Sequence, residues 1–322
     1  MAKENVNQTE IKLDKSDTMG PWQIAWNKFR QNKIAMAGLI IFILIVLAVI
    51  FVPIISGVNV NDYSFDTKNI GPNAEHWLGT DQQGRDVFFR LFLGGRISIM
   101  VGIIAALITV FLGCVIGGIS GYYGGWIDNL LMRFAEIVYS LPFTPLILVL
   151  AYNMLWTPSN VKMYIVSFLI GVLSWPGLAR LVRGQILSLR EQEFMQACEA
   201  LGLSDFSKIF KHLIPNVLSM IIVNATLSMA SAILTEAGLS FLGMGVTAPT
   251  PSWGNLMELA RNTEVFQDFP WNWLPAGIMC LLTVISINLI GEGLRDAFDP
   301  KDIRSVSYTH LGAHETELHL VC

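Results

Sequence analysis

The sequence predicts an all-α membrane protein with six transmembrane helices. Of its 322 residues, 53% are hydrophobic and only 14% are charged, whereas a soluble domain carries roughly 25% charged residues. The mean hydropathy of +0.52 applies to the whole chain. A single helical span needs only about 20 apolar residues, so several spans are required to explain these values.

Runs without Asp, Glu, Lys or Arg, apart from Glu136 near the start of the third, mark the expected spans in chain order. The first is too long for a signal-peptide core and has no small-residue cleavage site, so we expect it to remain as an anchor. The second carries Gly113, Gly117 and Gly121 on one helix face, which predicts close approach of another helix. Pro142 and Pro145 predict a kink in the third. The six runs cover 34–55, 97–120, 134–155, 163–179, 216–235 with an extension to about 242, and 273–290.

The distribution of basic residues predicts the orientation of these spans. If the N-terminus is inside, 15 of the 21 Lys and Arg residues fall in inner segments. Short cytoplasmic loops collect Lys and Arg, so we expect both termini in the cytoplasm. The long outer loops are then 56–95 and 243–272, and the one large inner loop is 180–215.

The inner loop predicts two short helices joined by a turn. The first ends near Leu201, Gly202 follows as a left-handed terminator, and Ser204 caps the second. Pro215 ends the second helix and begins the next span. Within that helix, four apolar residues recur at helical spacing: Phe206, Ile209, Phe210 and Leu213. This stripe either packs against the protein's own helix ends or docks a cytosolic partner.

The same loop resembles the coupling loop of ABC importer permeases. The resemblance rests on Gln196-Ala197-Cys198, Gly202 and Leu213-Ile214-Pro215, although Gln196 replaces the usual Glu and Cys198 the second Ala. Further blocks are similar to the second (C-type) permease subunit of bacterial dipeptide and oligopeptide ABC transporters. These blocks are Trp26, Phe29, Asn32-Lys33 and Gly38, then 76–98, 235–257 and 293–301.

This resemblance implies a type I ABC importer permease fold and a transport function. It implies pairing with a homologous permease to form the pathway, with two cytoplasmic ATPase subunits on the inner loops and a peptide-binding protein outside. The implied substrates are dipeptides and oligopeptides, or related small solutes such as nickel complexes. The implied ATPase-coupling residues are Gln196, Ala197, Cys198, Gly202, Ser204, Asp205, Phe206, Ile209, Phe210, Leu213 and Pro215.

The division of the chain follows from the spans and the resemblance. We expect a cytoplasmic segment (1–33), a first anchor (34–55), an extracytoplasmic loop (56–95), and a permease core (96–301) with five transmembrane helices and the coupling loop 180–215. The tail, 302–322, lies beyond the resemblance and shifts abruptly in composition. We interpret it as non-native or disordered, and its His310, His314, His319 and Cys322 as no zinc site.

Other function classes fit the sequence less well. The chain has no Gly-Lys dipeptide, hence no phosphate-binding loop of the Walker type, so it is not expected to hydrolyse ATP. A net charge of −4 argues against a nucleic-acid partner. No cofactor or metal site is expected.

The alternative function class is an autonomous secondary carrier or channel. Such a carrier would place acids near the membrane midplane, but Glu136 and Glu236 lie toward the span ends. We interpret both as structural, Glu136 paired with Arg133, and the outer Gly79–Gly84 region as a turn held by side-chain hydrogen bonds.

Overall fold

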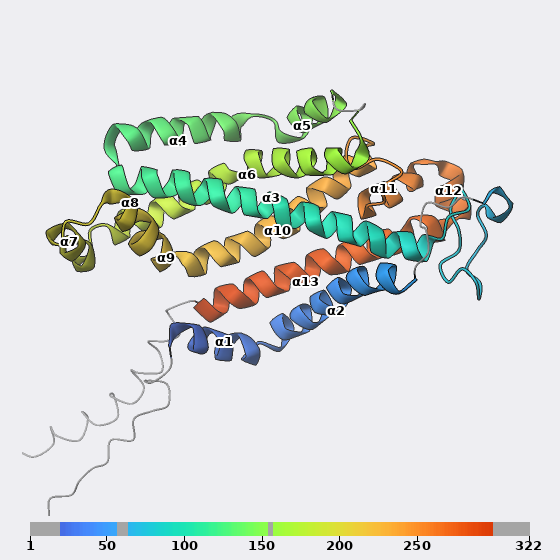
Figure 1. Ribbon diagram of the computed structural model, residues 1–322, viewed down its shortest axis with the longest axis horizontal. Coiled ribbons are helices and arrows are strands. Elements are labelled where there is room, and N and C mark those ends of the chain that lie inside the picture. The colour runs from blue at the N-terminus through green and yellow to red at the C-terminus, as the bar shows by residue number, and fades with distance from the viewer. Residues whose placement is uncertain (1–19, 57–63, 154–156, 299–322) are drawn as a thin grey trace, which may run out of the picture.

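The computed structural model describes residues 20–56, 64–153 and 157–298. Within these ranges the chain is helical, with no strand, and five helices are long and apolar enough to cross a membrane. They run side by side in one elongated bundle (Figure 1). These helices are α2 (Lys33–Ser56), α3 (Val87–Tyr123), α6 (Ser159–Leu189), α10 (Leu218–Phe241) and α13 (Leu274–Phe298). The predicted all-α membrane fold is confirmed.

A sixth span is formed by two helices that meet at a bend. Helices α4 (Gly125–Ser140) and α5 (Phe143–Tyr152) differ in direction by 78°. Leu141, between them, has the extended backbone (φ −68°, ψ 134°) that is favoured before a proline. The kink predicted at Pro142 is therefore confirmed, and the prediction of six spans holds if this pair counts as one.

Several helices extend beyond the uncharged runs. Helix α3 begins at Val87, inside the segment predicted as outer loop, and α6 continues to Leu189, well past the predicted start of the inner loop at 180. Its 37 residues give α3 a length of about 55 Å at 1.5 Å per residue, against about 30 Å for the hydrocarbon core. Counting uncharged residues locates the lipid-buried part of a helix, whereas the helix itself continues until its backbone is capped.

The glycine face of α3 packs against α6, as predicted. A Cβ atom added to Gly113 would lie 2.8 Å from the Leu178 side chain, and one added to Gly121 would lie 2.9 Å from the Arg183 carbonyl oxygen. At Gly117 it would overlap the Ala179 carbonyl oxygen. The small residues therefore allow the backbones of α3 and α6 to approach closely.

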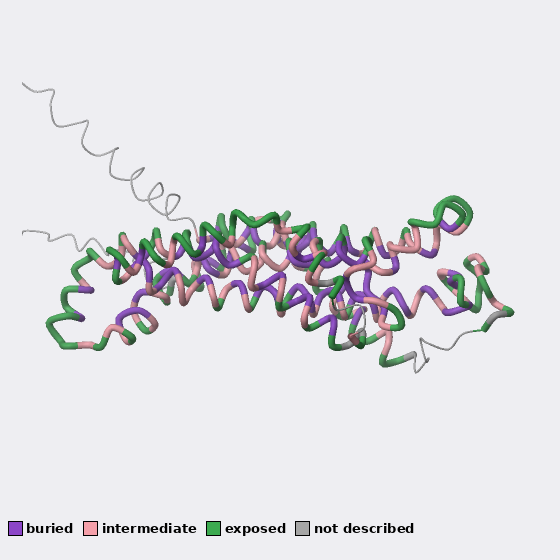
Figure 2. The backbone as a smooth tube through the Cα atoms, turned by 90° about the horizontal axis from the view of Figure 1, so that it is seen from above, coloured by how far each residue is buried: buried purple, intermediate pink, exposed green. Residues whose placement is uncertain are grey.

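The short helices gather at the two ends of the bundle (Figure 1). One end carries α1 (Pro21–Gln31), α7 (Glu193–Ala200), α8 (Asp205–Ser207), the π-helix η3 (Lys208–Leu213) and α9 (Ile214–Asn216). The other end carries η2 (Phe65–Thr67), α11 (Trp253–Glu258), η4 (Leu259–Arg261), α12 (Thr263–Asp268) and η5 (Pro270–Asn272). Buried residues follow the middle of the bundle, and the α7 end projects beyond it (Figure 2).

Candidate functional site

The turn of the predicted coupling loop has the backbone geometry that the sequence indicates. Gly202 follows α7 with φ +69°, and Leu203 N–H donates to the Cys198 carbonyl while Gly202 N–H donates to the Glu199 carbonyl. This is the Schellman motif that ends a helix with a left-handed glycine. Ser204 then accepts a hydrogen bond from Ser207 N–H at 3.4 Å and caps α8. Both the terminator and the cap are confirmed.

The apolar residues after the turn do not form the single stripe predicted for them. Ile209 and Leu213 are buried, whereas Phe206 is 67% exposed and its ring lies 4.7 Å from that of half-buried Phe210. The segment from Lys208 to Leu213 is a π-helix, whose i→i+5 hydrogen bonds change the spacing at which residues share a face. The prediction of one apolar face is therefore wrong, because the face divides between the protein interior and solvent.

The second short helix of the coupling loop also ends at a slightly different place from the one predicted. Pro215 lies within α9, and the break before α10 comes at Val217, whose φ of −103° and ψ of 7° leave the helical region. A proline is tolerated in the first turn of a helix because its missing N–H would have no intrahelical partner there. Pro215 therefore begins a helical turn, as expected, but does not itself interrupt the chain direction.

The remaining predicted loop residues also divide into buried and exposed ones. Cys198 is buried, with Met195 beside it in α7 among the buried residues. Gln196 and Ala197 are exposed, and Leu201 is 78% exposed. We use the term coupling surface for the exposed residues Gln196, Ala197, Leu201 and Phe206.

Asp205 ties the coupling loop to the end of α3. Its carboxylate accepts hydrogen bonds from the hydroxyls of Tyr122 at 2.7 Å and Tyr123 at 3.2 Å. The Lys208 ammonium lies 3.6 Å from Asp205 and 3.9 Å from Glu199. The hydrogen bond from Tyr122 is the main reason that the pKa of Asp205 lies below its ordinary value.

The sequence pattern did not predict that the two tyrosines contact the coupling loop. Their signal is modest: they are adjacent aromatic residues with hydroxyls at the inner end of a predicted span, directly before Gly124 and Gly125. Only the tertiary structure brings them to Asp205, which lies more than 80 residues later in the chain.

A second polar cluster joins three helices just inside the same end. The Arg183 guanidinium on α6 forms a bidentate ion pair with Asp128 on α4, and Ser120 on α3 donates to the same carboxylate. Arg190 Nη1 donates to the carbonyls of Gly121 and Tyr122 at 3.2 Å each. The ends of α3, α4 and α6 nearest the coupling loop are therefore fastened together.

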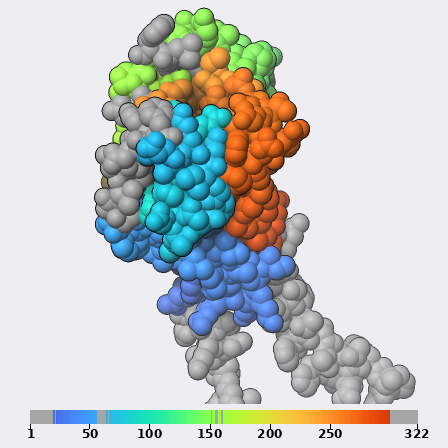
Figure 3. Space-filling view, turned by 90° about the vertical axis from the view of Figure 1, so that its right-hand side faces the viewer, coloured from blue at the N-terminus to red at the C-terminus, as the bar shows by residue number. Residues whose placement is uncertain are grey.

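The opposite end carries the predicted turn, and Figure 3 looks onto it. Gly79 and Gly84 have φ values of +73° and +74°, and Asp81 accepts hydrogen bonds from the backbone N–H groups of Gln83 and Arg85. The Arg85 guanidinium also pairs with Asp81 at 2.7 Å. The prediction of a turn held by side-chain hydrogen bonds is confirmed.

The turn also contacts the second outer loop. Trp271 Nε1 donates to the Thr80 carbonyl at 3.4 Å, and Asn272 Nδ2 donates to Asn69 Oδ1 at 3.3 Å. Segment 64–86 and the α11–α12 region consequently form one continuous cap at this end, as Figure 3 shows.

The two acidic residues that the sequence placed toward span ends, Glu136 and Glu236, are both paired. Glu236 on α10 is fully buried and accepts hydrogen bonds from Ser98 at 3.1 Å, Ser240 at 2.6 Å and Ser252 at 3.0 Å. Glu136 forms an exposed ion pair with Arg133 at 2.8 Å. Both residues therefore have the partners within the protein that their structural interpretation predicts.

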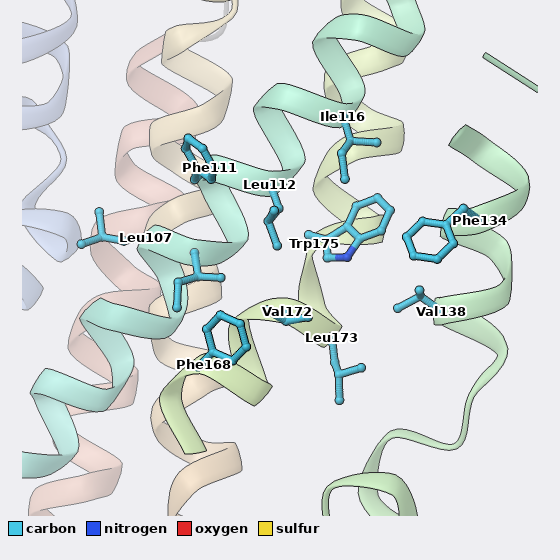
Figure 4. Close-up of a pocket in the computed structure, with 11 residues that line it drawn as sticks. Leu107, Phe111, Leu112, Ile116, Phe134, Val138, Phe168, Val172, Leu173 and Trp175 are labelled. Carbon is cyan, nitrogen blue, oxygen red and sulfur yellow. The ribbon is translucent and has the colours of Figure 1, made fainter. Parts of the chain in front are cut away.

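Two grooves open along the helices. One, of about 580 Å³, lies between α3, α4 and α6 and is lined by apolar side chains and Trp175 (Figure 4). The other, of about 640 Å³, lies between α6, α10 and α13 near the coupling loop and includes Gln185, Asn224 and Arg295. Only the second groove offers several hydrogen-bonding groups to a solute.

Comparison with known families identifies the architecture. Residues 98–303 match the model of the binding-protein-dependent transport system inner membrane component. The chain belongs to this family. Residues 20–72 also match the N-terminal transmembrane domain of oligopeptide transport permease C. Together the two matches cover α1, α2, most of α3 and all the later spans, which confirms the predicted family.

Similar proteins extend over most of the chain. A putative peptide permease protein of Brucella suis is 42% identical over 285 residues, covering 88% of this chain and 92% of that protein. The oligopeptide transport system permease protein of Bacillus subtilis is 40% identical over 286 residues, covering 87% and 90%. The corresponding oligopeptide permease protein of Haemophilus influenzae is 42% identical over 285 residues, covering 87% and 89%. The chain is therefore a multi-pass membrane permease component.

Proposed function

We propose that this protein is a permease subunit of an ATP-driven ABC importer that moves dipeptides and oligopeptides into the cytoplasm. The observation that carries the proposal is about 40% identity, over nearly the whole chain, to proteins named as peptide permeases. Related small solutes such as nickel complexes form the second substrate class. The family resemblance implies that a homologous permease subunit completes the pathway, and both grooves of this bundle are open along its sides rather than enclosed within it.

The coupling surface is the proposed docking site for a cytoplasmic ATPase, one of two in the complex. Phe206 and Leu201 are large apolar side chains left in solvent at a projecting end of the molecule. Exposed apolar groups of this kind, with charged neighbours such as Asp205 and Lys208, are typical of a protein interface.

The contacts behind that surface explain how a movement of the ATPase would reach the membrane. Leu213 packs in one cluster with Val182 and Ile186 of α6 and with Ile221 of α10. Asp205 is hydrogen-bonded to α3 through Tyr122. A push on Phe206 is therefore applied to three spanning helices together, as a rigid-body transition between outward and inward openings requires.

The orientation is proposed from charge. The end with the coupling loop carries Lys28, Arg30, Lys33, Arg190, Lys208 and Lys211, and the positive-inside rule assigns such an end to the cytoplasm. The opposite cap, made by segment 64–86 and α11–α12, is then available to an extracytoplasmic peptide-binding protein.

Reconstitution in liposomes tests the function. The protein is combined with its partner permease, the ATPase subunits and the binding protein, and uptake of a radiolabelled dipeptide is followed. We expect uptake only when ATP, binding protein and all subunits are present. Uptake by this chain alone, driven by an ion or substrate gradient, would instead establish an autonomous carrier or channel.

A further inference from the structure

The groove between α6, α10 and α13 carries several hydrogen-bonding side chains, of which two amides, Asn216 and Asn224, donate to backbone carbonyls of the preceding turn. Its polar lining consists of Gln185 on α6, Ser219 and Asn224 on α10, Asn216 on α9 and Arg295 on α13. In the described part of the chain, the side chains of Gln185 and Ser219 make no hydrogen bond. Asn224 Nδ2 donates to the Met220 carbonyl at 2.9 Å, which leaves its carbonyl oxygen available.

These groups lie within helices that cross the membrane. Asn224 is six residues into α10, about 9 Å from the beginning of that helix, and Gln185 lies four residues before the end of α6. Gln185 lies in the part of α6 beyond its uncharged run, whereas Asn224 lies within the uncharged run of α10, where an amide oxygen without a partner is unfavourable against lipid. The groove is therefore expected to face water or another polar molecule.

Glycines on α6 and α10 have open space in front of their Cα atoms. A Cβ atom added to Gly184 or Gly177 on α6, or to Gly238 on α10, would meet no atom within 4 Å. Gly113, Gly117 and Gly121 differ, because a side chain at any of them would clash with α6. Ser231, seven residues after Asn224 and seven before Gly238, is exposed on the same face of α10.

We propose that this groove binds the main chain of the transported peptide, an inference that rests on the proposed function. Amide and hydroxyl side chains can hydrogen-bond to peptide N–H and C=O groups whatever the side chains of the peptide are. Among the described lining residues, Arg295 alone is charged. It lies three residues before the end of α13, where it can attract the carboxylate terminus of a peptide.

The size and contents of the groove fit this occupant. Its volume of about 640 Å³ falls within the range of roughly 300–1,000 Å³ that small-ligand sites span. Apolar walls from Leu181, Val223 and Leu227 alternate with the amides. The groove in Figure 4 has comparable size but offers no amide or hydroxyl group, so it lacks the means to orient a peptide.

Cysteine labelling in the assembled transporter tests the proposal. In a variant whose native cysteines are replaced, Asn224→Cys and Gln185→Cys should react with a charged, membrane-impermeant thiol reagent applied from the cytoplasmic side of inverted vesicles. Excess dipeptide during turnover should slow that reaction. Leu130→Cys is the matched control, since Leu130 is 61% exposed and lies five residues into α4; it should not react.

A second measurement uses transport itself. Asn224→Leu should raise the KM for dipeptide uptake about fivefold, equal to about 1 kcal/mol, and Asn224→Gln should restore it. A complex that transports dipeptide with unchanged KM in Asn224→Leu, or with no dipeptide protection of the cysteines, overturns this inference and makes the groove a packing surface. A wild-type complex that transports no dipeptide overturns the proposed function instead.

Discussion

The turn at Gly202 allows a graded test of the coupling loop. Its φ of +69° lies in the region that side chains other than glycine rarely adopt, and a Cβ atom there would meet nothing within 4 Å. Substitution therefore adds backbone strain without a steric clash. The left-handed conformation costs roughly 1–2 kcal/mol for an ordinary residue and less for Asn, whereas a β-branched residue is a still rarer occupant.

This energy predicts an order of effects. A cost of about 1–2 kcal/mol lowers the population of the native turn by a factor of roughly 5–30 relative to competing conformations. Dipeptide-stimulated ATP hydrolysis and uptake should be highest in the protein with native Gly202. Both should fall progressively in the variants Gly202→Asn, Gly202→Ala and Gly202→Val. Membrane insertion and pairing with the second permease should persist, because the spans retain their buried contacts.

Gly243 provides the matched control. It has a similar φ of +80°, its neighbours are the flexible ends of Glu258 and Arg261, and it lies in the opposite part of the molecule, after α10. Gly243→Val should leave coupling close to the wild-type value after correction for complex yield. Full ATPase stimulation and uptake in Gly202→Val would refute the assignment of this loop to coupling.

Further predictions concern packing, burial and the tail. Gly117→Ala should lower the melting temperature of the purified complex, because the added carbon meets the Ala179 carbonyl and overpacking costs about 1–3 kcal/mol; Gly277→Ala, whose nearest neighbour is 3.7 Å away, should not. Glu236→Ala should also lower it, because three buried serine hydroxyls lose their shared acceptor and each group left unsatisfied costs about 1–3 kcal/mol. Glu236→Gln, which keeps an acceptor oxygen, should be milder, and equal melting temperatures would contradict this account. Truncation after Arg304 removes only residues beyond the family match, which ends at 303, so uptake should survive; loss of assembly would show that the tail is a structural element.

Features set by nearby residues were predictable from the sequence. The Schellman turn at Gly202 and the bend before Pro142 each depend on one residue type and its immediate neighbours. The close contact of α3 with α6 also followed from glycine spacing alone. In the first two cases the backbone preference of a single residue decides the local geometry, whereas the glycine spacing indicated a helix contact without indicating that the partner is α6.

Features that depend on distant contacts were not predictable in the same way. The segment from Lys208 to Leu213 is a π-helix that nothing in the residue pattern indicates, and Phe206 is exposed while Ile209 is buried. The Asp205–Tyr122 hydrogen bond and the Arg183–Asp128 pair join residues from separate helices. The inner extension of α6 was missed because its arginines are partnered by α3 and α4 rather than by water alone.

The most direct test of the central claim is photo-crosslinking from the coupling surface. A benzophenone amino acid is placed at Phe206, and separately at Gln267 of α12, which is exposed at the opposite end. In the assembled transporter we predict an adduct with the ATPase from position 206, and an adduct with the peptide-binding protein but no ATPase adduct from position 267. An ATPase adduct from position 267, or none from position 206 in a complex that is active and intact, would contradict the assignment of the coupling surface.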